Sequence, residues 1–170
     1  MSQKAKNEIL KVVTDITKEV PGGEKFFDIL DEFLCSIEAE WIITSALRML
    51  PRSHTLILSG GMGKRIADGI DSGSFPNRSY VLFKGSVRKT GHVEMIRHSG
   101  EIQKLSTFFD DSIYGGVTFF KIKEWIENDG NFPIPQHVFA IYDGCPEKRD
   151  FVKSMFRYYD FFQPTPNFQF

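Results

Sequence analysis

Apolar residues recur at intervals of three or four over residues 1–50. One series ends before Pro21-Gly22-Gly23 and consists of Ile9, Val13, Ile16 and Val20; a second extends from Phe26 to Leu50. This spacing places the apolar side chains on one face of a helix. We therefore expect two N-terminal helices that serve as scaffold.

From residue 54 the pattern changes to short apolar runs. These runs predict strands at His54–Ser59, Tyr80–Phe83, Leu105–Phe109 and Val138–Tyr142. Helical spacing follows at Lys64–Asp68, Val117–Asp129 and Lys148–Tyr159, while the polar residues 84–100 predict either a loop excursion or a hairpin with Val93–Ile96. Alternating strands and helices predict an α/β fold: a Rossmann-like, mainly parallel sheet flanked by helices, with an N-terminal helical segment.

The length of 170 residues suits a single domain. We expect helices over residues 1–50, an α/β core over 54–142 and an aromatic-rich C-terminal segment over 143–170. Phenylalanine and tyrosine are concentrated in the last twenty residues of that segment. A packed cap, a contact within a homodimer and part of a ligand site are the interpretations that this cluster leaves open.

The overall charge narrows the function classes. The chain has 21 basic and 22 acidic residues and a net charge of −1, which excludes a general electrostatic attraction to nucleic acid or anionic membrane. No apolar run reaches the roughly 18 residues of a membrane helix, and no signal-peptide pattern opens the sequence. Two cysteines without paired spacing indicate no disulfide framework. A cytoplasmic protein is the expectation.

Candidate chemistry begins at Asp110 and Asp111, an acidic couplet placed where the third strand is predicted to end. Adjacent carboxylates repel each other unless a ligand or cation compensates, and vicinal sugar hydroxyls suit them as hydrogen-bond donors. The segment that follows supplies glycines, hydroxyls and a helix start, which together suit a phosphate; its residues are Ser112, Ile113, Tyr114, Gly115, Gly116, Val117 and Thr118. A ribose 5-phosphate combines both groups, whereas the alternative is an Asp-rich turn that only caps a helix.

The segment resembles the signature of type I phosphoribosyltransferases, which bind 5-phosphoribosyl 1-pyrophosphate (PRPP). That signature has apolar strand residues, an acidic pair and a small phosphate loop ending in Gly-x-Thr, matched here by Gly116 and Thr118. Ser106 and Thr107 in the strand, and Tyr114 and Gly115 in the loop, depart from it. The chain is thus expected to be a divergent member.

The resemblance extends to the order of segments over residues 54–142. Family members carry a pyrophosphate-binding glycine turn after the first core strand, where this chain has Ser59, Gly60 and Gly61, with Lys64 close behind. A flexible basic loop often follows in the family, at the place of Arg88 and Lys89. A solvated charged turn is the other interpretation of that stretch.

The resemblance implies displacement of pyrophosphate from PRPP by a nitrogen acceptor, usually a nucleobase. Asp110 and Asp111 would act as the catalytic carboxylates on the ribose, with Mg²⁺ bound through PRPP, and Tyr142 could stack on the base. A non-catalytic protein that binds PRPP or a nucleotide is the first alternative. The second is a nucleotidyltransferase, because Gly60-Gly61-Met62-Gly63-Lys64-Arg65 resembles the triphosphate turn of that class.

Overall fold

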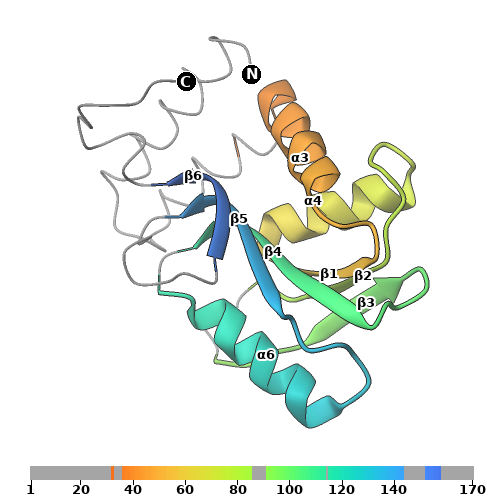
Figure 1. Ribbon diagram of the computed structural model, residues 1–170, viewed down its shortest axis with the longest axis vertical. Coiled ribbons are helices and arrows are strands. Elements are labelled where there is room, and N and C mark those ends of the chain that lie inside the picture. The colour runs from red at the N-terminus through yellow and green to blue at the C-terminus, as the bar shows by residue number, and fades with distance from the viewer. Residues whose placement is uncertain (1–31, 33–35, 86–90, 114, 144–151, 158–170) are drawn as a thin grey trace. The chain divides into compact units, whose positions relative to one another are not determined.

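The computed structural model describes residue 32 and residues 36–85, 91–113, 115–143 and 152–157. The chain forms two compact units, Met1–Ser45 and Ala46–Phe170. Helix α3 (Ile37–Met49) begins in the first unit, and the second contains a six-stranded sheet of order β3-β2-β1-β4-β5-β6 (Figure 1). The strands are β1 (His54–Ser59), β2 (Tyr80–Phe83), β3 (Met95–Ser99), β4 (Leu105–Ile113), β5 (His137–Asp143) and β6 (Val152–Arg157). That the whole chain is one domain stays a prediction.

The sheet is mainly parallel, as the sequence predicts. β1 pairs in parallel with β2 and β4, and β5 pairs in parallel with β4 and β6. β3 runs antiparallel to β2, so the hairpin alternative for residues 84–100 is confirmed for the described part of that segment. The predicted N-terminal helices upstream of residue 32 lie outside the described residues.

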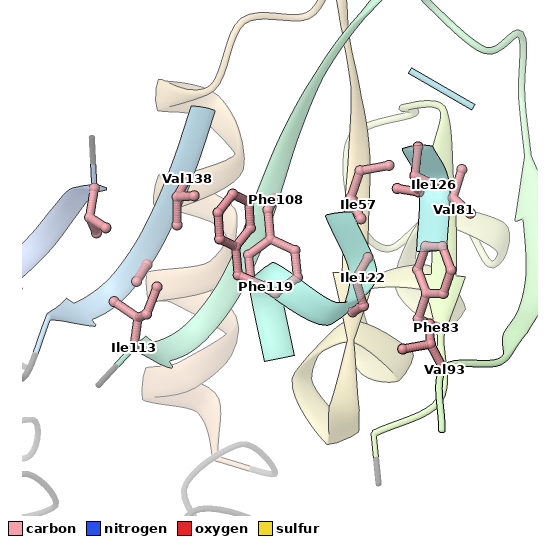
Figure 2. Packing of buried hydrophobic residues seen from close by; sticks show 12 residues of the cluster. Ile57, Val81, Phe83, Val93, Phe108, Ile113, Phe119, Ile122, Ile126 and Val138 are labelled. Carbon is pink, nitrogen blue, oxygen red and sulfur yellow. The ribbon is translucent and has the colours of Figure 1, made fainter. Parts of the chain in front are cut away.

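Two helices cover opposite faces of this sheet (Figure 1). On one face, α6 (Val117–Asp129) packs through Phe119, Ile122 and Ile126 against a cluster that includes Ile57, Val81, Phe108 and Val138 (Figure 2). On the other, α4 (Gly60–Asp71) buries Met62, Ile66, Ala67 and Ile70. Because alternate residues of a strand face opposite sides, the fully buried strands β1 and β2 carry apolar side chains on both faces, at Leu56–Leu58 and Val81–Phe83.

The expected helix over Lys148–Tyr159 is wrong. Val152–Arg157 forms strand β6, which pairs with β5 from Val138↔Val152 to Asp143↔Arg157. Val152 is 4% exposed and belongs to the main apolar cluster, so this strand is part of the hydrophobic core. Pairing with the otherwise open edge of β5 gives the backbone N–H and C=O groups of this segment hydrogen-bond partners. This pairing outweighs the helical preference that the spacing of its apolar residues indicates.

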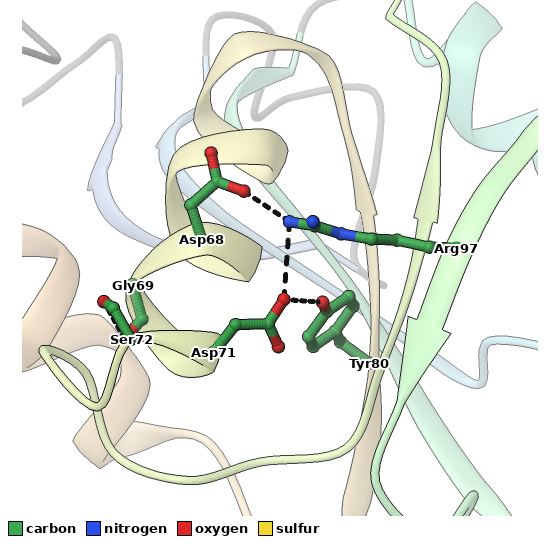
Figure 3. Close-up of polar contacts among 6 residues, drawn as sticks. All are labelled: Asp68, Gly69, Asp71, Ser72, Tyr80 and Arg97. Carbon is green, nitrogen blue, oxygen red and sulfur yellow. Dashed lines mark hydrogen bonds and ion pairs between the residues drawn. The ribbon is translucent and has the colours of Figure 1, made fainter.

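A polar cluster joins α4 to β2 and β3 (Figure 3). Arg97 on β3 bonds to Asp68 and lies 3.5 Å from Asp71, and the Tyr80 hydroxyl donates to Asp71 at 2.7 Å. Burial and the hydrogen bond to Asp71 raise the pKa of Tyr80 to about 12, so the phenol stays protonated and keeps donating. The cluster thus fixes the second half of α4 on the sheet.

α4 also approaches a buried ring closely at Gly69. A Cβ atom at this position would lie 2.1 Å from Cδ2 of Phe75, and the Phe75 backbone N–H donates to the Gly69 carbonyl at 2.9 Å. Phe75 is 5% exposed. Glycine therefore occupies position 69 because the ring leaves no room for a side chain.

A histidine pair lies where β1 and β5 begin, at the amino edge of the sheet. The rings of His54 and His137 stack with centroids 5.5 Å apart, and Nδ1 of His54 lies 2.9 Å from Oγ1 of Thr107. His54 is 6% exposed. Burial, and then the charges of His137 and Arg78, lower the pKa of His54 from its ordinary value of 6.5. The folded protein therefore favours the neutral ring.

This lowered pKa predicts that stability falls with acidification. Below pH 6.5 the unfolded chain protonates His54 before the folded protein does, so the free energy of unfolding decreases as pH falls from about 7.5 to about 5. We expect thermal unfolding of His54→Gln to show a shallower decline in Tm over that range. Thr107→Val, which removes the hydrogen bond and keeps the ring, should lower Tm with the wild-type slope. An unchanged slope in His54→Gln would contradict this account.

No helix among residues 36–85, 91–113, 115–143 and 152–157 is long and apolar enough to cross a membrane. The predicted cytoplasmic location stays a prediction.

Candidate functional site

The two segments singled out from the sequence meet at one edge of the sheet. β1 and β4 are parallel neighbours with Leu58 opposite Phe109, so the residues after Leu58 and after Phe109 leave the same side. The strand order reverses here, because β2 lies on one side of β1 and β4 on the other. Open α/β sheets bind ligands at the carboxyl ends of strands where the order reverses. We call this side the carboxyl edge.

The first segment at the carboxyl edge is the glycine turn, Ser59–Gly61. Ser59 ends β1 and is the N-cap of α4, but its side chain makes no capping hydrogen bond. Gly60 has a φ of +70°, a conformation that favours glycine. The first N–H groups of α4 have no partner within the helix, so the turn presents donors and the positive end of the helix dipole at the edge.

The rest of this segment belongs to the helix itself. Met62 and Gly63 are buried in α4, whereas Lys64 is exposed. A Cβ at Gly63 would lie 3.1 Å from the carbonyl carbon of Leu58, so the helix packs closely on the strand it follows. The six residues from Gly60 to Arg65 are therefore the first half of α4, packed against β1.

The acidic couplet lies inside β4 and not beyond its end. β4 continues to Ile113, and pairs Asp110 with Ala140, Ser112 with Tyr142 and Ile113 with Asp143. The prediction that the strand ends at Phe109 is therefore wrong. The parallel neighbour β5 extends equally far, and its ladder satisfies the backbone of the acidic residues.

The couplet is half-buried and held by its own neighbours. The Asp111 backbone N–H donates to Oδ1 of Asp110 at 3.0 Å, and the Ser112 hydroxyl donates to Oδ2 of Asp111 at 2.7 Å. Phe108 and Ile113 belong to the same apolar cluster although they are an odd number of residues apart (Figure 2). Strict alternation of faces therefore ends between them, in the stretch that contains the couplet.

The second helix at the carboxyl edge, α6, begins four residues after the end of β4. Gly116 is its N-cap with a φ of +72°, and no side chain caps the end of the helix. Its carbonyl accepts the Phe120 N–H at 3.0 Å, so Val117 and Thr118 form the first turn, as the sequence predicts. Gly115 is exposed at the entry, and Tyr114 lies outside the described residues. α4 and α6 thus both start at this edge, through left-handed glycines and without side-chain caps.

Other predicted residues are placed less completely. Arg88 and Lys89 lie outside the described residues, and Tyr142 is described only as a backbone position in β5, opposite Ser112. Two residues that sequence reasoning did not assign to the site lie at the same edge. Asp143, at the end of β5, is 1% exposed, and Gly85 follows β2 against the glycine turn. For Asp143 the sequence signal is an aspartate at the end of an apolar strand. No sequence signal identifies Gly85.

The part of the chain that the structure describes contains no group of three or more His, Cys, Asp or Glu side chains that could enclose a metal ion. The carboxylates of the acidic couplet can still supply one or two oxygen ligands. Mg²⁺ is commonly held in this way, with substrate phosphates and water completing its coordination.

No family model matches the sequence, and no curated protein is similar to it in sequence. Among solved structures, hypoxanthine phosphoribosyltransferase from Staphylococcus aureus matches at 14% identity and a TM-score of 0.41, over 69% of this chain and 72% of the other. The same enzyme from Trypanosoma cruzi, solved with the product IMP, matches at 12% identity and a TM-score of 0.39, over 69% and 72%.

UMP synthase from Leishmania donovani matches at 12% identity and a TM-score of 0.46 over 74% of this chain, which spans only 28% of that protein's length. The likeness to these structures is one of strand and helix arrangement. Function is therefore argued from the residues of this chain.

Proposed function

We propose that the chain is a phosphoribosyltransferase that transfers the 5-phosphoribosyl group of PRPP to a nitrogen acceptor. One observation supports this most directly: two uncapped helix starts, at Gly60 and Gly116, follow adjacent strands of the sheet, and the acidic couplet precedes the second. Each helix start suits a phosphate group. Two phosphate sites with carboxylates beside one of them match a pentose with phosphate groups at both ends.

The carboxylates and the helix starts would have different tasks. Asp110 and Asp111 would accept hydrogen bonds from the 2- and 3-hydroxyls of the ribose, and residues 112–118, which lead from the end of β4 into α6, would bind the 5-phosphate. Ser59, Gly60 and Gly61 would bind the pyrophosphate through backbone N–H groups, with Lys64 as an exposed cation nearby. Half-buried carboxylates are less screened than surface ones, so they stabilise positive charge more effectively.

The reaction is then a displacement at C1 of the ribose. The bond between C1 and the pyrophosphate oxygen breaks with its electron pair on the oxygen, and a nitrogen lone pair forms the new bond to C1. Positive charge develops on the ring as in glycoside hydrolysis, and the couplet would stabilise that charge. Mg²⁺ bound through PRPP, with Asp110 and Asp111 as protein ligands, would neutralise charge on the leaving pyrophosphate.

The proposal also assigns residues to the nitrogen acceptor and to the charge of the pyrophosphate. A nucleobase is the nitrogen acceptor we propose, and Tyr142 would stack on it from β5. Arg88 and Lys89 would add positive charge near the pyrophosphate.

Calorimetry with PRPP, nucleoside monophosphates and nucleoside triphosphates, each with Mg²⁺, tests the proposal. We expect PRPP to bind, and pyrophosphate to be released when PRPP is supplied with a panel of nucleobases. Binding of PRPP without turnover would show a regulatory protein. Selective binding of a triphosphate that is lost in Arg65→Met would show a nucleotidyltransferase. Failure to bind PRPP would overturn the proposal.

A further inference from the structure

The backbone after β2 lies directly against the glycine turn. A Cβ atom at Gly85 would be 2.6 Å from Cα of Gly60 and 3.2 Å from its backbone nitrogen. Distances under 3.0 Å are essentially never seen for real Cβ atoms. Both atoms belong to the backbone, so no side-chain rotation relieves the contact. Position 85 therefore admits only glycine while Gly60 keeps its place.

The sheet explains why these two glycines meet. β1 and β2 are parallel, with Ser59 opposite Phe83, so both chains leave the sheet at the carboxyl edge. Gly60 begins α4 with a φ of +70° one residue after β1, and Gly85 follows β2 by two residues. The chain after β2 therefore passes over the turn at the point where its backbone changes direction.

Gly85 is also held by contacts on the other side of β2, where β3 lies. The Lys84 N–H donates to the Glu94 carbonyl at 2.9 Å, and Lys84 Nζ lies 2.9 Å from Oε2 of Glu94. The hydrogen bond from Lys84, and then its charge, lower the pKa of the Glu94 carboxyl, which favours the charged form in this ion pair. Gly85 is thus fixed to the β2–β3 pair and contacts α4 through the turn.

From this contact we infer that Gly85 is a positioning residue for the glycine turn, and that it sets the affinity of the pyrophosphate half of the site. The inference rests on the proposed function. Gly85 acts through Gly60. Its backbone holds the glycine turn in the position where the N–H groups of the turn face the carboxyl edge. Because glycine has no side chain, it also leaves the space beside these N–H groups open. The three atoms nearest to a Cβ at Gly85 all belong to Gly60, and none belongs to the α6 start.

The two halves of the site can be measured separately, with pyrophosphate for the glycine turn and ribose 5-phosphate for the α6 start. We expect Gly85→Ala to weaken pyrophosphate binding at least about tenfold, because the added methyl group displaces the backbone donors of the turn and the loss of one hydrogen bond to a charged ligand weakens binding by about this factor or more. The affinity for ribose 5-phosphate should stay within about twofold. Both are measured by calorimetry with Mg²⁺.

Gly69→Ala is the matched control. It adds the same methyl group, and its clash of 2.1 Å also bears on α4, but against the Phe75 ring at the far end of the helix and not against Gly60. Overpacking of this kind costs about 1–3 kcal/mol of stability. The control should therefore lower Tm while leaving both affinities unchanged, which separates loss of positioning from loss of stability.

A measurement on the unmodified protein decides the matter if Gly85→Ala does not fold. Adding pyrophosphate should shift the amide resonances of Gly60, Gly61 and Gly85 together, and adding ribose 5-phosphate should shift those of Gly116 and Val117. If Gly60 responds and Gly85 does not, or if Gly85→Ala binds pyrophosphate as the wild type does, the positioning role is overturned and the proposed function stands. If the wild type binds neither pyrophosphate nor PRPP, the proposed function fails and this inference with it.

Discussion

Replacing both residues of the acidic couplet with asparagine is expected to reduce the affinity for PRPP at least about 100-fold while the protein folds normally. Hydrogen bonds to charged groups contribute about 1.5–3 kcal/mol each, and about 1.4 kcal/mol corresponds to a factor of ten in affinity. Asparagine keeps an oxygen at each position. The Asp111 N–H and the Ser112 hydroxyl, which donate to the couplet at 3.0 and 2.7 Å, therefore retain their acceptors.

Calorimetry with PRPP and Mg²⁺ measures this effect, and thermal unfolding verifies the fold. The double variant Glu101→Gln, Asp129→Asn is the control, since it changes the net charge equally at two exposed residues, one between β3 and β4 and one at the end of α6. The control should bind PRPP within about twofold of the wild type. A folded Asp110→Asn, Asp111→Asn protein with wild-type affinity would remove the couplet from the site.

The core strands and helices could be predicted because local sequence and tertiary environment agree there. His54–Ser59 and Tyr80–Phe83 are short apolar runs bounded by polar or glycine residues, and both are strands with these bounds. α6 starts at Val117 and stops at Gly130, whose φ of +75° fits a helix C-cap. Since parallel strands share an edge, the adjacency of the two candidate segments followed from the predicted fold class.

The errors arise where a neighbouring strand outweighs local preference. Val152–Arg157 has apolar residues at helical intervals, and two aspartates are poor strand residues, so the sequence predicted a helix and a strand end. Both stretches instead pair with β5, which provides ladders on its two sides. Hydrogen-bond partners of this kind depend on chain segments far away in sequence.

The contact between Gly85 and Gly60 is beyond sequence reasoning for a different reason. Nothing in the residues around position 85 distinguishes this glycine from one in an ordinary turn. Its role depends on the register of β1 with β2, which places two chain exits within contact distance. The candidate site could thus be predicted as a set of segments, but not as a set of contacts.

Arg78 is expected to be the residue whose loss destabilises the fold most. It is 5% exposed, and its guanidinium donates to the carbonyls of Leu47 at 3.0 Å, Leu50 at 3.1 Å and His54 at 3.5 Å. It also bonds to the Pro51 carbonyl. Two of these acceptors, at Leu47 and Leu50, are in the last turn of α3 and just after it, where carbonyls have no partner within the helix. One side chain therefore binds four carbonyls between the last turn of α3 and the start of β1.

The variant Arg78→Met keeps the length and the apolar stem of the side chain but removes the guanidinium donor from all four carbonyls, of which Pro51 still accepts from the His54 N–H at 3.2 Å. Each buried polar group left unsatisfied costs about 1–3 kcal/mol, so we expect the free energy of unfolding in urea to fall by at least about 3 kcal/mol. Arg52→Met, at an exposed neighbour, should change it by less than about 0.5 kcal/mol. Arg78→Lys should lie between the two, because an ammonium cannot reach all four carbonyls as the planar guanidinium fork does. Equal unfolding midpoints for Arg78→Met and the wild type would mean that water satisfies these carbonyls as well as the arginine does.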